Sequence, residues 1–115
     1  MKNIEDGTSA LQQFEEASIT HGHASEIGDF KMCNNAYEVI VQATAFLKQI
    51  SDLESLKVYF EHTEVGPRLW AAAYLLSVDG SGARAVLKKI VKGGGIHALT
   101  AETTLGEWEK GRLRL

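Results

Sequence analysis

The sequence predicts an all-α protein, and three features lead to that class. Apolar residues recur at helical spacing along the chain. No segment alternates between apolar and polar residues as a half-buried strand does, and no Asn-Gly hairpin turn is present. The only proline, Pro67, precedes an apolar run and suits the first turn of a helix, where its missing N–H costs nothing.

The length of 115 residues and the hydrophobic content of 44% suit one domain with its own core. We expect that domain to span 1–115, with an ordered part of about 8–111. Cys33 is the single cysteine, so no internal disulfide can form and a reducing cytoplasm is the expected location. The first residues lack an apolar signal core, and no apolar run is long enough to span a bilayer.

The first helix is expected to begin at Thr8 or Ser9, since either hydroxyl can accept a bond from a free backbone N–H. Gly22 and Gly28 each offer an end to it. The second helix is expected to begin at Ser25 or at Asp29, with Asp29 favoured because it directly follows Gly28, and to run to about Ile50. Two apolar stripes lie side by side along this second helix, which indicates contact with other helices on two sides.

A capping box is expected to open a short third helix. In Ser51–Glu54 the serine hydroxyl and the glutamate carboxylate could each satisfy a free N–H, and apolar residues follow up to Phe60. The fourth helix begins at Pro67 and contains the run "RLWAAAYLL", which is apolar on nearly every side. Such a segment needs helices all round it, so we expect Trp70 to be largely buried.

Two more helices complete the predicted fold. Ser81 is the expected cap of the fifth, which ends at the glycines from Gly93 onward. The sixth spans about 97–110, with Trp108 largely buried and Gly111 as its stop. About six short sequential helices with tight turns should stack as antiparallel pairs in the manner of an α-solenoid, with the fourth helix covered by the third, fifth and sixth.

Charge is distributed unevenly along the chain. Residues 1–64 carry eleven acids and four bases, a balance of −7, whereas residues 65–115 carry four acids and eight bases, a balance of +4. Solvated faces of an ordinary helical protein would give such a pattern, and so would an acidic half that meets a basic partner. The acidity of the first half would repel a nucleic acid, so no nucleic-acid partner is expected for the basic half. That half's patch would comprise Lys88, Lys89, Lys92, Arg112 and Arg114.

No motif in the sequence points to catalysis, a metal or a cofactor. On a helix the i, i+2 spacing of His21 and His23 points the two rings apart, and no Cys or His cluster completes a site. The glycines at 93–95 lack the Lys-Ser/Thr of a phosphate-binding loop and a preceding strand. Cys33 lies on an apolar stripe and is expected to fill space in the core.

Two segments resemble a known family. "GPRLWAAAYLL" at 66–76 and "ARAVLKKIVKGG" at 83–94 are similar to a HEAT or armadillo repeat, although the arginine here follows a proline where a valine is usual. With "GDFKMCNNAYEVI" in the second helix and "TAETTLGEWEKGRLR" at the end, the chain resembles a small bacterial family of HEAT-like helical proteins of unknown function. The resemblance covers 8–114, and Thr104–Leu105…Trp108…Gly111 is its most specific part.

The resemblance implies a short HEAT/ARM-like solenoid and a bacterial origin, and some small helical proteins of this kind are immunity proteins. We therefore expect a non-catalytic module that binds and neutralises a basic toxin, such as a nuclease, through its acidic half. A cytoplasmic helical-repeat adaptor for another protein is the alternative. The expected partner-facing residues are Glu15, Glu16, Glu38, Glu61 and Glu64, with Tyr59 and His62 as anchors.

Overall fold

The structure, a computed structural model, describes residues 3–115, so the first two residues of the predicted domain lie outside the described part. Residues 3–115 form helices joined by short turns and contain no strand, which confirms the all-α prediction. The elements are α1 (Gly7–Ile27), α2 (Phe30–Gln49), the 3-10 helix η1 (Leu53–Tyr59), α3 (Val65–Leu75), α4 (Gly80–Lys92) and α5 (Gly95–Glu109). None of these helices is both long and apolar enough to cross a bilayer.

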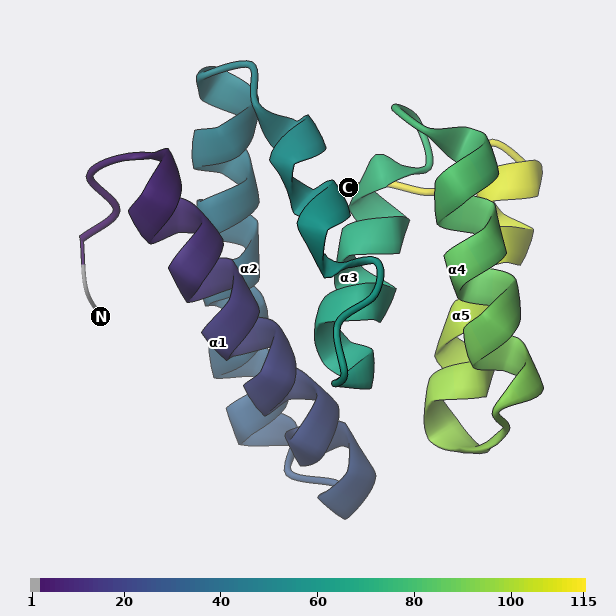
Figure 1. The fold of residues 1–115 in the computed structure, drawn as a ribbon. Coiled ribbons are helices and arrows are strands. Elements are labelled where there is room, and N and C mark those ends of the chain that lie inside the picture. The colour runs from purple at the N-terminus through teal and green to yellow at the C-terminus, as the bar shows by residue number, and fades with distance from the viewer. Residues whose placement is uncertain (1–2) are drawn as a thin grey trace.

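The helices close around one core. α1 and α2 run antiparallel as a hairpin, α3 lies near the middle, and α4 and α5 form a second pair on its other side (Figure 1). The Cα radius of gyration is 13.2 Å, close to the ~13 Å that a compact chain of this length has. α1 also contacts α5, so the first and last helices meet.

The apolar segment 68–76 is covered on every side. All of its residues are buried except Arg68 and Trp70, which are partly buried. α3 packs against η1, α4 and α5 as the sequence predicts, and also against α1, which the sequence did not indicate. Trp70 and Trp108, expected to be largely buried, are partly buried and pack against the core.

Glycine allows α1 and α3 to approach closely. A Cβ on Gly66 of α3 would lie 2.8 Å from the carbonyl carbon of Ser18 and 3.3 Å from the nitrogen of Ile19, both in the α1 backbone. Gly22 of α1 lies at the same crossing, where an added Cβ would be 3.5 Å from the Cα of Gly66. Small residues at a helix crossing bring the two backbones together, and this crossing attaches the α1–α2 hairpin to the remainder of the fold.

Aspartates, and not the predicted hydroxyls, cap two of the helices. Asp6 caps α1: its carboxylate accepts from the N–H of Ser9 at 2.8 Å, and its own N–H donates to the Ser9 hydroxyl at 3.2 Å. Ser9 is therefore the third residue of a capping box, and neither it nor Thr8 is the cap. Asp79 caps α4 by accepting from Gly82, where Ser81 was expected.

The predicted capping box at Ser51 is wrong. Ser51 instead ends α2 in the left-handed conformation, with φ 57°, and its N–H donates to the Lys48 carbonyl while the next N–H, of Asp52, donates to Leu47. These two bonds form a Schellman motif, which places Ser51 outside the next helix. The segment that follows is the 3-10 helix η1, with Asp52 at its start and no side-chain cap.

α2 lies at the edge of the fold. The expected contact with other helices is made mostly by α1, with a smaller contact to η1. Some apolar residues of both stripes stay exposed. Phe30 remains 78% exposed, and Met32 and Tyr37 are each 42% exposed. The Tyr37 ring reaches Trp70 of α3, with ring centroids 5.7 Å apart. The outer face of α2 therefore carries exposed apolar side chains among exposed polar ones such as Lys31 and Gln42.

Candidate functional site

The segment between η1 and α3, residues 60–64, lies between α1 and α4. We call it the junction loop. One side lies against α1 through histidine–carboxylate contacts, and the other borders a cleft that faces α4. Five of the seven predicted partner-facing residues meet in or beside it: Glu15, Tyr59, Glu61, His62 and Glu64.

His62 orders the α1 side of the loop. Its Nε2 lies 2.8 Å from Oε2 of Glu15, and its Nδ1 accepts the backbone N–H of Glu64 at 2.9 Å. Because a backbone N–H can only donate, the ring proton resides on Nε2 and points at the Glu15 carboxylate. The Glu64 side chain in turn reaches back to α1, with Oε2 3.2 Å from Nε2 of His23. Glu15 and Glu64 are thus bound within the chain.

Tyr59 belongs to the core. It is 8% exposed, its ring stacks on Phe14 at 5.5 Å, and its hydroxyl donates to the Leu11 carbonyl at 2.9 Å. Burial, and then the nearby Glu15 charge, raise the pKa of Tyr59 to about 12. The ring and the hydroxyl both hold the junction loop onto α1, which leaves Tyr59 little surface to offer a partner.

The other three predicted residues are exposed carboxylates. Glu61, Glu16 and Glu38 form no ion pair within residues 3–115. Glu61 borders the cleft that faces α4, whereas Glu16 borders a groove between α1 and α2, and Glu38 is on α2. The predicted set therefore divides between bound carboxylates that hold the loop and free ones that remain available to a partner.

A groove of about 350 Å³ runs between α1 and α2, and its surface is mostly apolar. The lining residues are Gln13, Glu16, Ala17 and Thr20 of α1, and Met32, Asn35, Ala36 and Val39 of α2. The sequence placed Glu16 on a partner-facing surface but gave no sign of the groove, whose lining includes the small Ala17 and Ala36. The groove combines a mostly apolar surface with one carboxylate, that of Glu16, which forms no ion pair within the described residues.

A larger cleft of about 820 Å³ separates η1, the junction loop and α3 from α4. Its lining residues are Lys57, Phe60, Glu61, His62, Arg68, Ala85, Val86, Lys88, Lys89 and Lys92. The sequence grouped the α4 lysines with Arg112 and Arg114, but the structure places Lys57 and Arg68 in the cleft instead. The signal that could have found it is α4 itself, which carries four bases and no acid.

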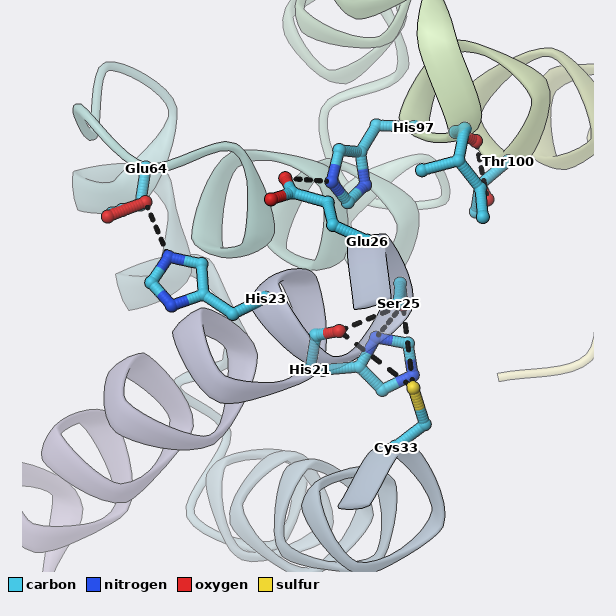
Figure 2. A network of polar contacts seen from close by, with 9 residues as sticks. His21, His23, Ser25, Glu26, Cys33, Glu64, His97 and Thr100 are labelled. Atoms are coloured by element: carbon cyan, nitrogen blue, oxygen red, sulfur yellow. Dashed lines mark hydrogen bonds and ion pairs between the residues drawn. The ribbon is translucent and has the colours of Figure 1, made fainter. Parts of the chain in front are cut away.

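A second polar cluster lies where α1 ends (Figure 2). The Ser25 hydroxyl donates to the His21 carbonyl at 2.8 Å and lies 3.6 Å from Sγ of Cys33. Cys33 is partly buried there. Burial, and then the His97 charge, lower the pKa of His21. Beside this cluster His97 of α5 points at Glu26, with Nε2 2.8 Å from Oε2.

The polar clusters do not assemble a metal site. Residues 3–115 hold no group of three His, Cys, Asp or Glu side chains arranged to hold a metal ion. Comparison of the chain with protein-family models, with curated proteins and with solved structures gives no match. The family resemblance of the sequence stays a prediction, and function is argued below from the chain's own surfaces.

Proposed function

We propose that the protein is a non-catalytic module that binds another protein through its acidic side. In its most specific form it is an immunity protein that neutralises a basic bacterial toxin, such as a nuclease. The observation that carries the proposal is the groove between α1 and α2, in which the free Glu16 carboxylate borders a mostly apolar surface. A groove of this kind suits an amphipathic segment with basic flanks.

The chemistry of the groove supports binding in two ways. Apolar surface supplies the affinity, and Met32 at its edge can adjust to a partner because its side chain is unbranched and flexible. Exposed apolar surface that is contiguous, as it is in this groove, is typical of interaction sites. Glu16 and Glu38 add the charge that steers a basic partner.

The proposal of a non-catalytic role rests on how the reactive side chains are used. The Ser25 hydroxyl donates to a carbonyl one turn earlier in its own helix, so its proton is directed at the backbone. The imidazole of His62 donates to Glu15 and accepts from a backbone N–H, so both ring nitrogens are occupied. These bonds hold helix ends and a loop in place, as a binding scaffold requires.

The alternative within the same class is a cytoplasmic helical-repeat adaptor that binds another protein. The antiparallel pairing of α1 with α2, and the sequential packing of α3, α4 and α5, support kinship with HEAT/ARM-like solenoids. The contact between α1 and α5 makes this fold more closed than an extended solenoid, in which each repeat contacts its neighbours.

The test is binding kinetics against a candidate basic toxin, for which the product of an adjacent gene is the first choice. Glu16→Lys should slow association about 3- to 10-fold at low salt, and the effect should shrink as salt rises, because exposed charges are screened. Glu102→Lys, the same charge change at an exposed site on α5, is the matched control and should leave the rate nearly unchanged. Equal effects of the two variants, or an effect that salt does not alter, would remove the α1–α2 groove from the interface.

A further inference from the structure

α4 presents a row of positive charge that nothing in the described chain neutralises. Arg84, Lys88 and Lys92 follow one another at intervals of four residues, and Lys89 lies beside the row. All four side chains are exposed, and none forms an ion pair within residues 3–115. Like charges four residues apart destabilise a helix, so the row is a cost that an anionic partner would relieve.

The cleft turns part of this row into one wall of a binding surface, and Arg84 is not among its lining residues. Lys88, Lys89 and Lys92 line it from α4, and Lys57 and Arg68 line it from the opposite elements. The opposite cations are held in place. Lys57 lies 3.3 Å from Glu54 and 3.5 Å from Asp79, while Nε of Arg68 donates to the Glu64 carbonyl at 3.4 Å. The α4 lysines are the free cations of the cleft.

The cleft also has apolar surface between its charged walls. Phe60, Ala85 and Val86 line it, with Phe60 and Val86 partly buried against the core. A ligand that fits this arrangement carries anionic groups at its edges and an apolar group between them. A single inorganic anion would use the lysines but leave the apolar surface wet.

The spacing of the row fits an extended peptide. Four residues of helix rise about 6 Å, which separates successive charges of the row. An extended peptide places alternate side chains on one side at intervals of about 6.6–6.8 Å. Acidic residues at alternate positions would therefore meet successive bases, while the residues between them face Phe60 or solvent. A helix in the cleft would need acids at every fourth position instead.

Two observations favour an acidic peptide over a nucleic acid. The Glu61 carboxylate lines the same cleft and would repel a phosphate backbone that fills it. The chain as a whole carries a net charge of −3, which repels a long polyanion extending beyond the cleft. A short acidic segment stays within reach of the five cations and carries fewer charges past Glu61 and past the rest of the chain, so both repulsions on it are smaller.

We propose that the cleft between α4 and the junction loop binds an extended acidic segment of a partner protein, with acidic residues at alternate positions. This surface is separate from the α1–α2 groove of the proposed function and opposite to it in charge. The two surfaces together would let the protein hold one partner with both basic and acidic parts, or two partners at once.

The test uses a labelled peptide of about eight residues, ~27 Å when extended, in which Glu alternates with Leu and Thr. A peptide of the same composition with its glutamates in one block is the register control. A single-stranded oligodeoxynucleotide of equal charge tests the competing ligand. Fluorescence anisotropy at about 25 and about 150 mM salt gives the affinities. We expect the alternating peptide to bind tightest and to weaken as salt rises.

The variant Lys89→Glu/Lys92→Glu should weaken binding of the alternating peptide at least about tenfold. Lys110→Glu/Arg112→Glu makes the same charge change at exposed positions outside the cleft and should change affinity much less. Glu61→Gln should tighten binding, and Glu16→Lys should leave it unchanged, which separates this result from the proposed function. Three results would overturn the proposal. They are an equal loss of affinity in the two charge-reversal double variants, no binding of the alternating peptide at low salt, and tighter binding of the oligonucleotide than of the peptide. Circular dichroism confirms that each variant remains folded.

Discussion

The Nε2 atom of His97 in α5 lies 2.8 Å from Oε2 of Glu26 in α1, although 71 residues separate them in sequence (Figure 2). Two further contacts of the same type leave α1, from Glu15 to His62 and from His23 to Glu64. Each joins α1 to a segment that follows α2 in the chain. Apolar packing between α1 and α3 is thus flanked by polar contacts that set how the hairpin is oriented on the core.

A double-mutant cycle of His97→Ala and Glu26→Ala should give a coupling free energy of about 0.5–1 kcal/mol at low salt, measured by denaturant unfolding. The value stays modest because the Glu26 side chain is 51% exposed, and it should fall in about 1 M salt. The His23–Glu64 pair, longer at 3.2 Å and more exposed, should couple less. A larger coupling for the His23–Glu64 pair would contradict the ranking.

Gly66→Ala should destabilise the protein by at least about 2 kcal/mol, because the new methyl group meets the α1 backbone at Ser18 and cannot be turned away. Gly22→Ala on the facing helix is the matched control. Its Cβ makes an ordinary 3.5 Å contact, and alanine favours a helix interior over glycine by up to about 1 kcal/mol. In thermal unfolding, Gly66→Ala should have the lowest melting temperature. Similar melting temperatures for the two variants would mean that α1 and α3 do not approach as closely as described.

Ser51→Gly should stabilise the protein by about 1 kcal/mol, since a side chain in the left-handed region is strained and glycine is not. Gly28→Ala is the reverse experiment at the end of α1. The φ there is 72°, and an added Cβ would have no atom within 4 Å, so its expected loss of about 1 kcal/mol is purely conformational. Urea unfolding measures both, and a loss of stability in Ser51→Gly would show that its hydroxyl matters more than its backbone.

Tyr59→Phe should cost about 1 kcal/mol at neutral pH, because it removes the hydrogen bond to Leu11 and keeps the stack on Phe14. The pKa of Tyr59, raised to about 12, adds a pH dependence. Between pH 10 and about 12 the unfolded tyrosine loses its proton while the folded one keeps it, so the stability of the native protein falls as pH rises.

The variant Tyr59→Phe should lack that part of the fall, which unfolding curves at pH 9 and about 11 would show. Burial also raises the pKa of Tyr74, but Tyr74 is present in both proteins and cancels in the comparison. Tyr37→Phe, at an exposed position, is the control and should keep the alkaline fall of the native protein. Equal falls in Tyr59→Phe and the native protein would contradict the burial of this hydroxyl.

The helices could be predicted from the sequence because helical periodicity is a local signal. The end of α1 was left open between Gly22 and Gly28, and the structure has it at Gly28. The sequence alone does not identify every N-cap residue. Asp6, Thr8 and Ser9 are all competent, and the reciprocal pair with Ser9 favours Asp6. At Ser51 the sequence offers the same residue to two helices, and the bonds that end α2 prevail over a new cap.

The parts of the candidate site that are adjacent in sequence were predictable, and the parts that packing brings together from different helices were not. Residues 59–64 read as one loop region, and Glu15, which the sequence assigned only to the partner-facing set, contacts His62 of that loop in the structure. Which of the predicted carboxylates are paired within the chain depends on which face of α1 meets the loop. Helical periodicity does not identify that face. The basic cleft needs Lys57 and Arg68 opposite α4, a placement set by how η1 and α3 pack.

The contact between α1 and α5 has a consequence for how the protein is made. The α1–α2 hairpin can form once residues 7–49 have left the ribosome, since its partners adjoin in sequence. The surface of α1 that meets α3 then stays uncovered until residues 65–75 emerge, and Glu26 waits longer still for His97. During synthesis the earliest helix is therefore the last to be fully enclosed, and its apolar side is the surface most open to chaperones or to misassociation in that interval.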